Sequence, residues 1–227
     1  MPGRLDAEPL RAAHAADEGF PLVICHGFTF WNHRDEIPPD NRLMREKLQF
    51  IRDHELAILR NHDCWDRWPG IGIPFAWARA LGFENEPSRV SASRYQHRYD
   101  IPPISLDRLA ARIARRCQSL GERAVQVIGD GDARVSRIGV GTGAVCRIEE
   151  FLQLECDCSI VCDDGARYWD QIQLAADMDH PVVRVNHGTS EEPGMATLAG
   201  YINANLPGLS ARHLSQGCRY RLVGGRS

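Results

Sequence analysis

The sequence predicts an α/β protein of two lobes, with mostly parallel or mixed sheets flanked by helices. The first observation is a strand–helix–strand order, in which apolar runs over residues 22–25 and 56–59 flank an amphipathic helix over residues 41–54. This order favours parallel pairing of the two strands. The second is that apolar runs and amphipathic segments alternate through the second half of the chain. We expect lobes over residues 1–121 and 122–227, and the C-terminal strand can return to the first lobe.

In the first lobe, the elements follow from apolar periodicity and from residues that favour helix ends. Asp40 is suited to cap the helix that follows it, and Ser105 is suited to begin a helix that ends at Gly121. Helices are expected over residues 6–18, 41–54, 74–81 and 105–120.

In the second lobe, the strongest hairpin signal is the segment AVQVIGDGDARVSRIGV, which indicates two strands around a Gly-Asp turn. Thr189 or Ser190 is suited to cap the last helix, with Pro193 in its first turn. The remaining expected elements are helices over residues 145–154, 166–178 and 190–205, strands over 158–162 and 181–186, and short C-terminal strands.

Composition limits the class of protein. The formal net charge of -3 gives no basic domain for nucleic acid, and Lys47 is the only lysine, so a lysine nucleophile is not expected. No apolar run approaches the ~20 residues that a membrane helix needs. The N-terminal stretch lacks the apolar core of a signal peptide, and the eight cysteines are scattered through the chain. We therefore expect a cytoplasmic protein with reduced thiols.

Three predicted strands are each followed almost at once by a histidine, namely His26, His62 and His187. Ligands of open parallel sheets bind beyond the carboxyl ends of the strands, so these imidazoles are expected at one cleft. Asp66 and Glu191 each stand four residues after one of these histidines. Imidazole with carboxylate suits Zn²⁺, Mn²⁺ or Fe²⁺. Spacing alone leaves open whether these residues bind metal or are hydrogen-bonded loop residues.

The same segments carry a family likeness. HGFTFWNHRDE, NHDCWD and NHGTSEEPGM resemble the signature segments of the NIF-three-like family, in order and spacing, from about residue 8 to the C-terminus. Members of that family form a dinuclear metal centre and are often described as GTP cyclohydrolase type 2-like. The resemblance implies that His26, Asp66, His187 and Glu191 bind one or two divalent ions. His62 is then the candidate for proton transfer, because imidazole titrates near neutral pH.

The chain departs from the family pattern in two places. An early His-His pair is reduced to His26, with Cys25 or Gly27 at the other position, and either Cys25 or His33 is a candidate for the missing ligand. The family also has one or two strands before the opening helix. Either the start codon is misassigned, or the first lobe exposes a sheet edge that favours oligomerisation.

The resemblance implies two alternative functions. One is a metal-dependent hydrolase that acts on a nucleotide, a related ring or a phosphoester, so a small-molecule substrate is expected. The other is a non-catalytic metal-binding scaffold or regulatory protein, favoured by the missing early ligand. In both cases the family implies a homo-oligomer, such as a hexameric ring, and no membrane partner.

Two further patterns have open interpretations. Gly139, Gly141 and Gly143 alternate between a strand and a helix, which suits a tight turn more than a phosphate cradle. Asp163 and Asp164 follow a predicted strand and resemble a family segment near the metal. They are expected either to orient a metal ligand or to lie in a solvated turn.

Overall fold

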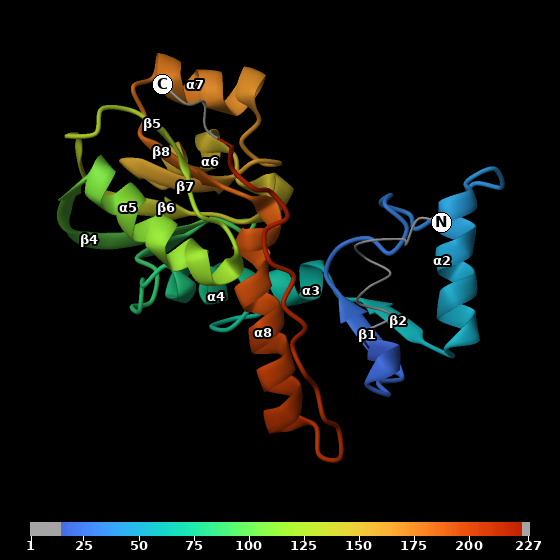
Figure 1. The fold of residues 1–227 in the computed structure, drawn as a ribbon. Coiled ribbons are helices and arrows are strands. Elements are labelled where there is room, and N and C mark those ends of the chain that lie inside the picture. Colours follow the sequence, from blue (N-terminus) through green and yellow to red (C-terminus); the bar gives the residue numbers. More distant parts are fainter. Residues whose placement is uncertain (1–14, 224–227) are drawn as a thin grey trace. The chain divides into compact units, whose positions relative to one another are not determined.

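The computed structural model describes residues 15–223 of a chain that forms two compact units, Met1–Cys64 and Trp65–Ser227 (Figure 1). The sequence analysis placed the boundary between lobes at Gly121. The segment before Gly121 lies in the C-terminal unit because its longest strand, β4 (His97–Ser105), pairs with β6 (Arg134–Val140). The boundary between the two units therefore lies after Cys64, about half as far along the sequence as the predicted boundary at Gly121.

The N-terminal unit contains the predicted strand–helix–strand order. Its elements are β1 (Leu22–Cys25), α2 (Arg42–Asp53) and β2 (Ala57–Arg60). The two strands pair in parallel, as predicted, with Leu22 opposite Ala57 and Cys25 opposite Arg60. The small core consists of buried side chains from the loop, the helix and the residue before β2, namely Phe30, Met44, Ile51 and Leu56. Of the expected helix over residues 6–18, residues 15–17 are helical, and residues 6–14 lie outside the described part of the chain.

The N-cap of α2 differs from the expectation. Asn41, and not Asp40, caps the helix, because its side-chain oxygen accepts a hydrogen bond from the backbone N–H of Met44 at 3.0 Å. Asn41 has extended backbone angles, with φ -81° and ψ 94°, which are typical of an N-cap residue. Asp40 stands one residue too early to reach that N–H.

The C-terminal unit is built on a six-stranded mixed sheet with the order β3-β4-β6-β7-β8-β5. The central strands β6, β7 and β8 are parallel, and β4 and β5 join them antiparallel. Its other strands are β3 (Arg89–Val90), β5 (Gln126–Ile128), β7 (Cys158–Cys162) and β8 (Val182–Val185). All five residues of β7 are buried, so the sheet is covered on both faces there.

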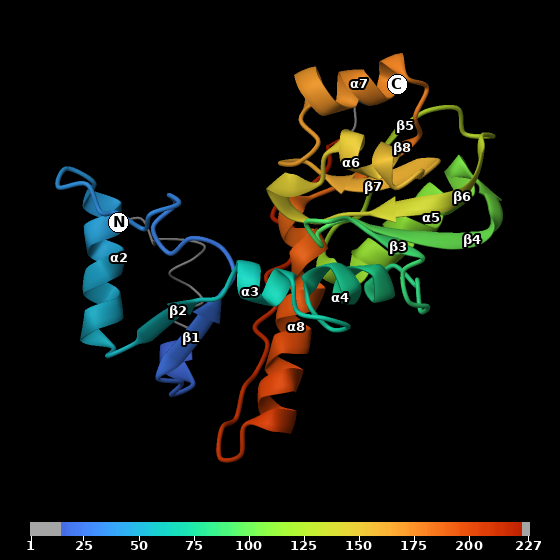
Figure 2. The same cartoon turned by 180° about the vertical axis from the view of Figure 1, so that it is seen from behind.

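Helices cover both faces of this sheet, with α5 on one side and α6 and α7 on the other (Figures 1 and 2). The core is continuous from α4 and α5 through the sheet to α6 and α7. The helices with their short 3₁₀ and π segments are α3 (Asp63–Asp66), α4 (Ile73–Ala80), α5 (Leu106–Cys117), η1 (Gln118–Leu120), η2 (Gly143–Val145), α6 (Ile148–Gln153), η3 (Tyr168–Ile172), α7 (Gln173–Asp177) and α8 (His187–Asn205). The α/β class with parallel and mixed sheets between helices is thus as predicted.

The predicted hairpin does not form. Both of its strands exist, as β5 and β6, but β5 pairs with β8 and β6 pairs with β4 and β7. The turn between them packs instead on the start of α5, where Leu106 and Asp107 donate backbone hydrogen bonds to the carbonyls of Ala133 and Gly131. Carbonyl groups of the turn accept hydrogen bonds from α5. The Gly-Asp turn sequence alone therefore did not determine how the two strands pair.

The last helix begins earlier than expected. Asn186 caps α8 by accepting a hydrogen bond from the N–H of Gly188 at 3.1 Å, so the prediction of Thr189 or Ser190 as the cap is wrong. Pro193 lies inside the helix, not in its first turn. The described residues after α8, 206–223, contain no strand, contrary to expectation. Within residues 15–223 no helix combines the length and the apolarity that crossing a bilayer requires.

Candidate metal centre

His26 and His62 come from neighbouring strands. His26 directly follows β1, and His62 stands two residues after the end of the parallel strand β2. Because parallel strands end at the same edge, the two imidazoles meet there. Their rings are stacked, with centroids 4.1 Å apart and planes inclined by 22°. His26 is buried and His62 is half-buried.

Asp66 completes a three-residue group with these histidines. It ends the four-residue helix α3, which begins directly after His62, and its side chain is buried. One ligand atom from each of His26, His62 and Asp66 lies within 4.8 Å of the others. Two imidazoles and a carboxylate form a donor set that suits Zn²⁺, Mn²⁺ or Fe²⁺. The structure therefore contains a group of residues that could hold a divalent ion.

His62 has a second contact that the spacing did not indicate. Its Nδ1 lies 2.8 Å from Oδ1 of Asp63, the next residue in the sequence. A carboxylate at one ring nitrogen fixes the orientation of an imidazole and leaves the other nitrogen for a ligand or a proton. Asp63 was missed because a contact between sequence neighbours leaves no periodic signal. His62, expected as a proton-transfer residue, thus lies among the candidate ligands.

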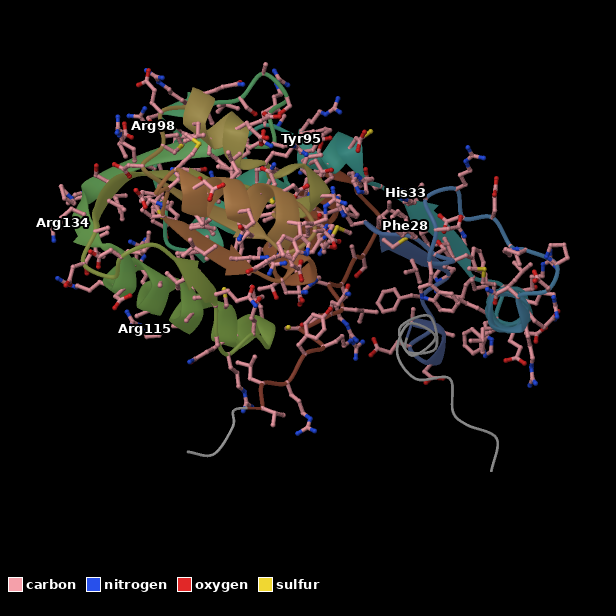
Figure 3. All side chains as sticks on the ribbon, turned by 90° about the horizontal axis from the view of Figure 1, so that it is seen from above. Phe28, His33, Tyr95, Arg98, Arg115 and Arg134 are labelled. Carbon is pink, nitrogen blue, oxygen red and sulfur yellow. The ribbon has the colours of Figure 1, made fainter. Side chains whose placement is uncertain are left out.

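The loop after β1 is tied to the rest of the N-terminal unit. Arg60 donates a hydrogen bond from Nη1 to the carbonyl of His33 at 2.9 Å, and Lys47 donates to the carbonyl of Thr29. The ring of His33 packs edge-on against Phe28 at 4.4 Å, and Figure 3 shows the two side chains next to each other. Among the described residues the candidate group includes neither Cys25 nor His33, the two candidates for the missing early ligand.

The second predicted pair, His187 and Glu191, lies in the C-terminal unit. His187 is the first residue of α8 and stands two residues after the end of β8, and Glu191 is one turn later on the same face. Nε2 of His187 is 2.6 Å from Oε1 of Glu191. The pair therefore presents an imidazole nitrogen and a carboxylate oxygen side by side, as a metal ligand pair requires.

Acidic residues hold His187 in this position. Asp164 contacts Nδ1 of His187 at 2.7 Å. Asp163 accepts a hydrogen bond from the backbone N–H of His187 at 2.8 Å. Asp163 also accepts a hydrogen bond from the side chain of Asn186, the cap of α8. The carboxylate of Glu122 accepts the backbone N–H of Asn186. The two aspartates thus orient the histidine, which was one of the two roles expected for them.

The charge around His187 is strongly negative. Burial lowers its pKa, but the hydrogen bond and charge of Glu191, with contributions from Cys162 and Asp164, outweigh burial and raise the pKa to about 10. An environment that stabilises an imidazolium also favours a bound cation. Burial raises the pKa of the nearby Glu122 carboxyl above its usual value. The residues of this pair fit a divalent cation in donor type and in charge.

Comparison with known proteins gives a family match over most of the chain. The family model described as Duf34/NIF3 (NGG1p interacting factor 3) matches residues 4–216. None of the curated protein sequences matches this chain.

Solved structures share the fold at low sequence identity. The protein ybgI, described as of unknown function, is 20% identical with a TM-score of 0.73, over 87% of this chain and 76% of that one. A Bacillus cereus protein related to NIF3 is 14% identical with a TM-score of 0.73, over 96% and 88%. Reduced HcgD from Methanocaldococcus jannaschii is 16% identical with a TM-score of 0.63, over 86% and 74%. At these identities the likeness shows the fold alone.

Proposed function

Because the chain belongs to the Duf34/NIF3 family, we propose that it binds divalent metal ions and uses them to hydrolyse a nucleotide, a related ring or a phosphoester. The observation that carries metal binding is the His26–His62–Asp66 group, whose ligand atoms lie within 4.8 Å of one another. His187 and Glu191 supply the second set of ligands. Zn²⁺, Mn²⁺ and Fe²⁺ are the ions that these donors suit, at one or two per chain.

The roles of the protein groups follow from their contacts. A bound divalent ion supplies Lewis-acid chemistry. His26, Asp66, His187 and Glu191 hold the ions, while Asp164 fixes the ring of His187. His62, oriented by Asp63, transfers the proton that hydrolysis requires. If His62 is instead a ligand, another group must carry that proton.

A metal-loading experiment tests the binding. The purified protein is loaded with Zn²⁺ or Mn²⁺, dialysed, and analysed for metal per chain. We expect one or two ions, and a loss of metal in His26→Ala and in His187→Ala. His54→Ala is the matched control, because His54 is an exposed histidine at the end of α2. A wild-type protein that retains well under one ion per chain would contradict the proposal.

The amount of metal lost in each of the two alanine variants tells whether the two ligand sets bind the same ions. If either substitution abolishes all binding, the ligands share one centre. If each removes half of the metal, the two sets bind separately. Loaded protein is then assayed on nucleotides and phosphodiesters, with metal-free protein as the blank.

A second candidate function is a non-catalytic metal-binding scaffold. The residue after His26 is Gly27, which offers no side chain where a ligand is expected from the family resemblance. The incomplete donor set favours a structural ion over a catalytic one. Metal-loaded protein that turns over none of the substrates would support this function, and light scattering would show whether it forms the expected homo-oligomer.

A further inference from the structure

The C-terminal unit contains a cavity that the proposed metal centre does not use. Its volume is about 360 Å³. Small-molecule sites in proteins occupy roughly 300–1,000 Å³, so the cavity is large enough for a small ligand. It is lined by residues 82–86 after α4, by residues 99–104 of β4, and by Arg108 and Arg112 of α5.

The cavity lies away from the His187–Glu191 pair. Ile104, which lines the cavity, is paired with Val135 near the start of β6. His187 lies beyond the end of β8, and β6, β7 and β8 all run in the same direction. The cavity is therefore toward the opposite end of these strands from His187, and a ligand there would occupy a separate site.

One wall of the cavity is an irregular stretch of β4. The register between β4 and β6 shifts after Asp100, so residues 101–103 have no partner on β6. Pro102 and Pro103 are exposed, and neither has a backbone N–H that could pair with another strand. Arg134 donates a hydrogen bond to the carbonyl of Pro103 at 2.8 Å, which holds this stretch in place. The two proline rings give the cavity an apolar wall.

Another wall carries arginines that are spaced one turn apart on α5. Arg108 and Arg112 line the cavity, and Arg116 follows one turn later. A Cβ atom at Gly82 would lie 2.8 Å from Nη2 of Arg112 and 3.1 Å from Nη2 of Arg116, so both guanidinium groups lie over this glycine. Within residues 15–223, none of the three arginines forms an ion pair.

Arg112 is fixed in position but its charge is not neutralised. It donates a hydrogen bond from Nη2 to the carbonyl of Gly82, and its guanidinium lies over the ring of Phe83, 5.0 Å from the centroid. Burial and the charge of Arg116 lower the pKa of Arg112, and the opposing effect of Glu84 is smaller. An anion bound beside Arg112 would favour its charged form.

Most acidic residues of the lining are engaged elsewhere. Asp100 accepts two hydrogen bonds from Arg98, at 2.7 and 3.3 Å, and Glu86 lies 3.7 Å from Arg79. Glu84 is exposed and, in the described part of the chain, has no ion pair. Two unpaired guanidinium groups in the lining thus stand against one unpaired carboxylate, and the cavity has an excess of unpaired positive charge.

We propose that this cavity binds a small organic anion. Its phosphoryl or carboxylate group contacts Arg108 and Arg112, and its apolar part packs on Pro102 and Pro103. A guanidinium suits either oxyanion, because its planar set of N–H donors can bind two oxygens at once. The site goes beyond the proposed function, since it contains none of the proposed metal ligands and binding there needs no metal.

The probes are phenyl phosphate and benzoate, compared with inorganic phosphate and acetate, which carry the same anionic groups without the ring. Each is titrated calorimetrically into the full chain at low ionic strength, both metal-free and loaded with Mn²⁺. We expect each phenyl probe to bind at least about tenfold more tightly than its small counterpart, because burial of the ring stabilises the complex. The tighter of the two phenyl probes identifies the phosphoryl or the carboxylate source. Removing the metal should leave these affinities unchanged.

Three variants locate the binding. Arg108→Ala should weaken the phenyl probes about tenfold, as loss of a charged hydrogen bond does, and Arg108 is exposed, so the fold should tolerate the change. Glu84→Gln should tighten binding, because it removes the unpaired carboxylate from the lining. Arg115→Ala is the matched control, since it makes the same change of charge at an exposed position of α5 that does not line the cavity. It should bind the probes as the wild type does.

Several results would overturn the inference. The first is a wild type that binds neither phenyl probe, or binds them no better than phosphate and acetate. Equal losses in Arg108→Ala and Arg115→Ala would show a general effect of charge, and weaker binding in Glu84→Gln would contradict an anion site. Binding that requires Mn²⁺ would place the anion at the metal centre. If light scattering shows that Arg108→Ala dissociates an oligomer, the cavity is an interface between copies. A chain that binds the probes but no metal would refute the proposed function and leave this inference intact.

Discussion

Asp164 contacts the ring nitrogen of His187 that faces away from Glu191. This arrangement of carboxylate, imidazole and proposed metal raises the basicity of the histidine and fixes its ring. Asp164→Asn keeps the shape of the side chain but removes the charge. We expect metal affinity to fall by about tenfold or more, as is typical for such partners. Calorimetric titration with Zn²⁺ measures it.

The control for this prediction is Asp177→Asn, which makes the same change of charge at an exposed position on α7. If the two variants bind metal equally well, the contact of Asp164 with His187 has no role in binding.

His97 on β4 gives a prediction about pH and stability. It is fully buried, with Nδ1 3.3 Å from the hydroxyl of Tyr99, and burial lowers its pKa to about 4. The unfolded chain binds a proton at its ordinary pKa of about 6.5. Protonation therefore favours the unfolded state, and stability is lost as the pH falls from about 6.5 towards 4.

We expect His97 to account for about 2 kcal/mol of the stability that the protein loses between about pH 7 and pH 5. His97→Leu removes the titrating group. Between about pH 7 and pH 5, the free energy of unfolding of this variant should therefore fall by about 2 kcal/mol less than that of the wild type. Urea denaturation of both proteins at the two pH values measures the difference. An identical pH dependence would show that His97 titrates normally.

At the scale of elements, the cap of α2 separates two residues that look equivalent in sequence. Asn41 caps the helix through Met44, whereas the exposed Asp40 does not. Asn41→Ala should lower the free energy of unfolding by about 1 kcal/mol. Asp40→Ala is the matched control and should have almost no effect. Thermal unfolding followed by circular dichroism tests both, and a larger loss in Asp40→Ala would reverse the assignment.

The sequence predicted the existence of most elements better than their partners. Periodicity located β1, β2 and β7 closely, because each strand coincides with a short run of apolar residues. Periodicity wrongly predicted that β5 and β6 pair as a hairpin, because strand pairing depends on residues far away in the chain. Here the turn between the two strands is hydrogen-bonded to the start of α5. Periodicity also placed the start of α8 too late, because Asn186 and Asp163 together fix a cap that neither indicates alone.

At the scale of the whole molecule, the same limit applies to the site. Three strand-end histidines were recognisable from spacing, but spacing does not show which sheet a strand belongs to. His26 and His62 follow a two-stranded sheet, whereas His187 follows β8 of the six-stranded sheet. The stacking of His26 on His62 depends on contacts across the fold. It has no sequence signal beyond a histidine after each strand.

The two units should differ in local stability. Strand β7 is buried along its whole length and has a paired neighbour on each side, whereas β1 and β2 form a two-stranded sheet over a small core. Leu22 on β1 and Leu59 on β2 are each about half exposed, at 46% and 50%. Two-stranded sheets gain little from burial, so the N-terminal unit should open more readily than the C-terminal unit.

Hydrogen exchange followed by mass spectrometry tests this difference. We expect the backbone amides of β7 and β8 to exchange on the order of a hundredfold more slowly than those of β1 and β2 in metal-free protein. If the His26–His62–Asp66 group binds metal, adding Zn²⁺ should slow exchange in β1 and β2, because binding to the folded state stabilises it. His26→Ala should abolish that slowing and leave β7 unchanged. Equal protection of all four strands without metal would mean that both units open as one.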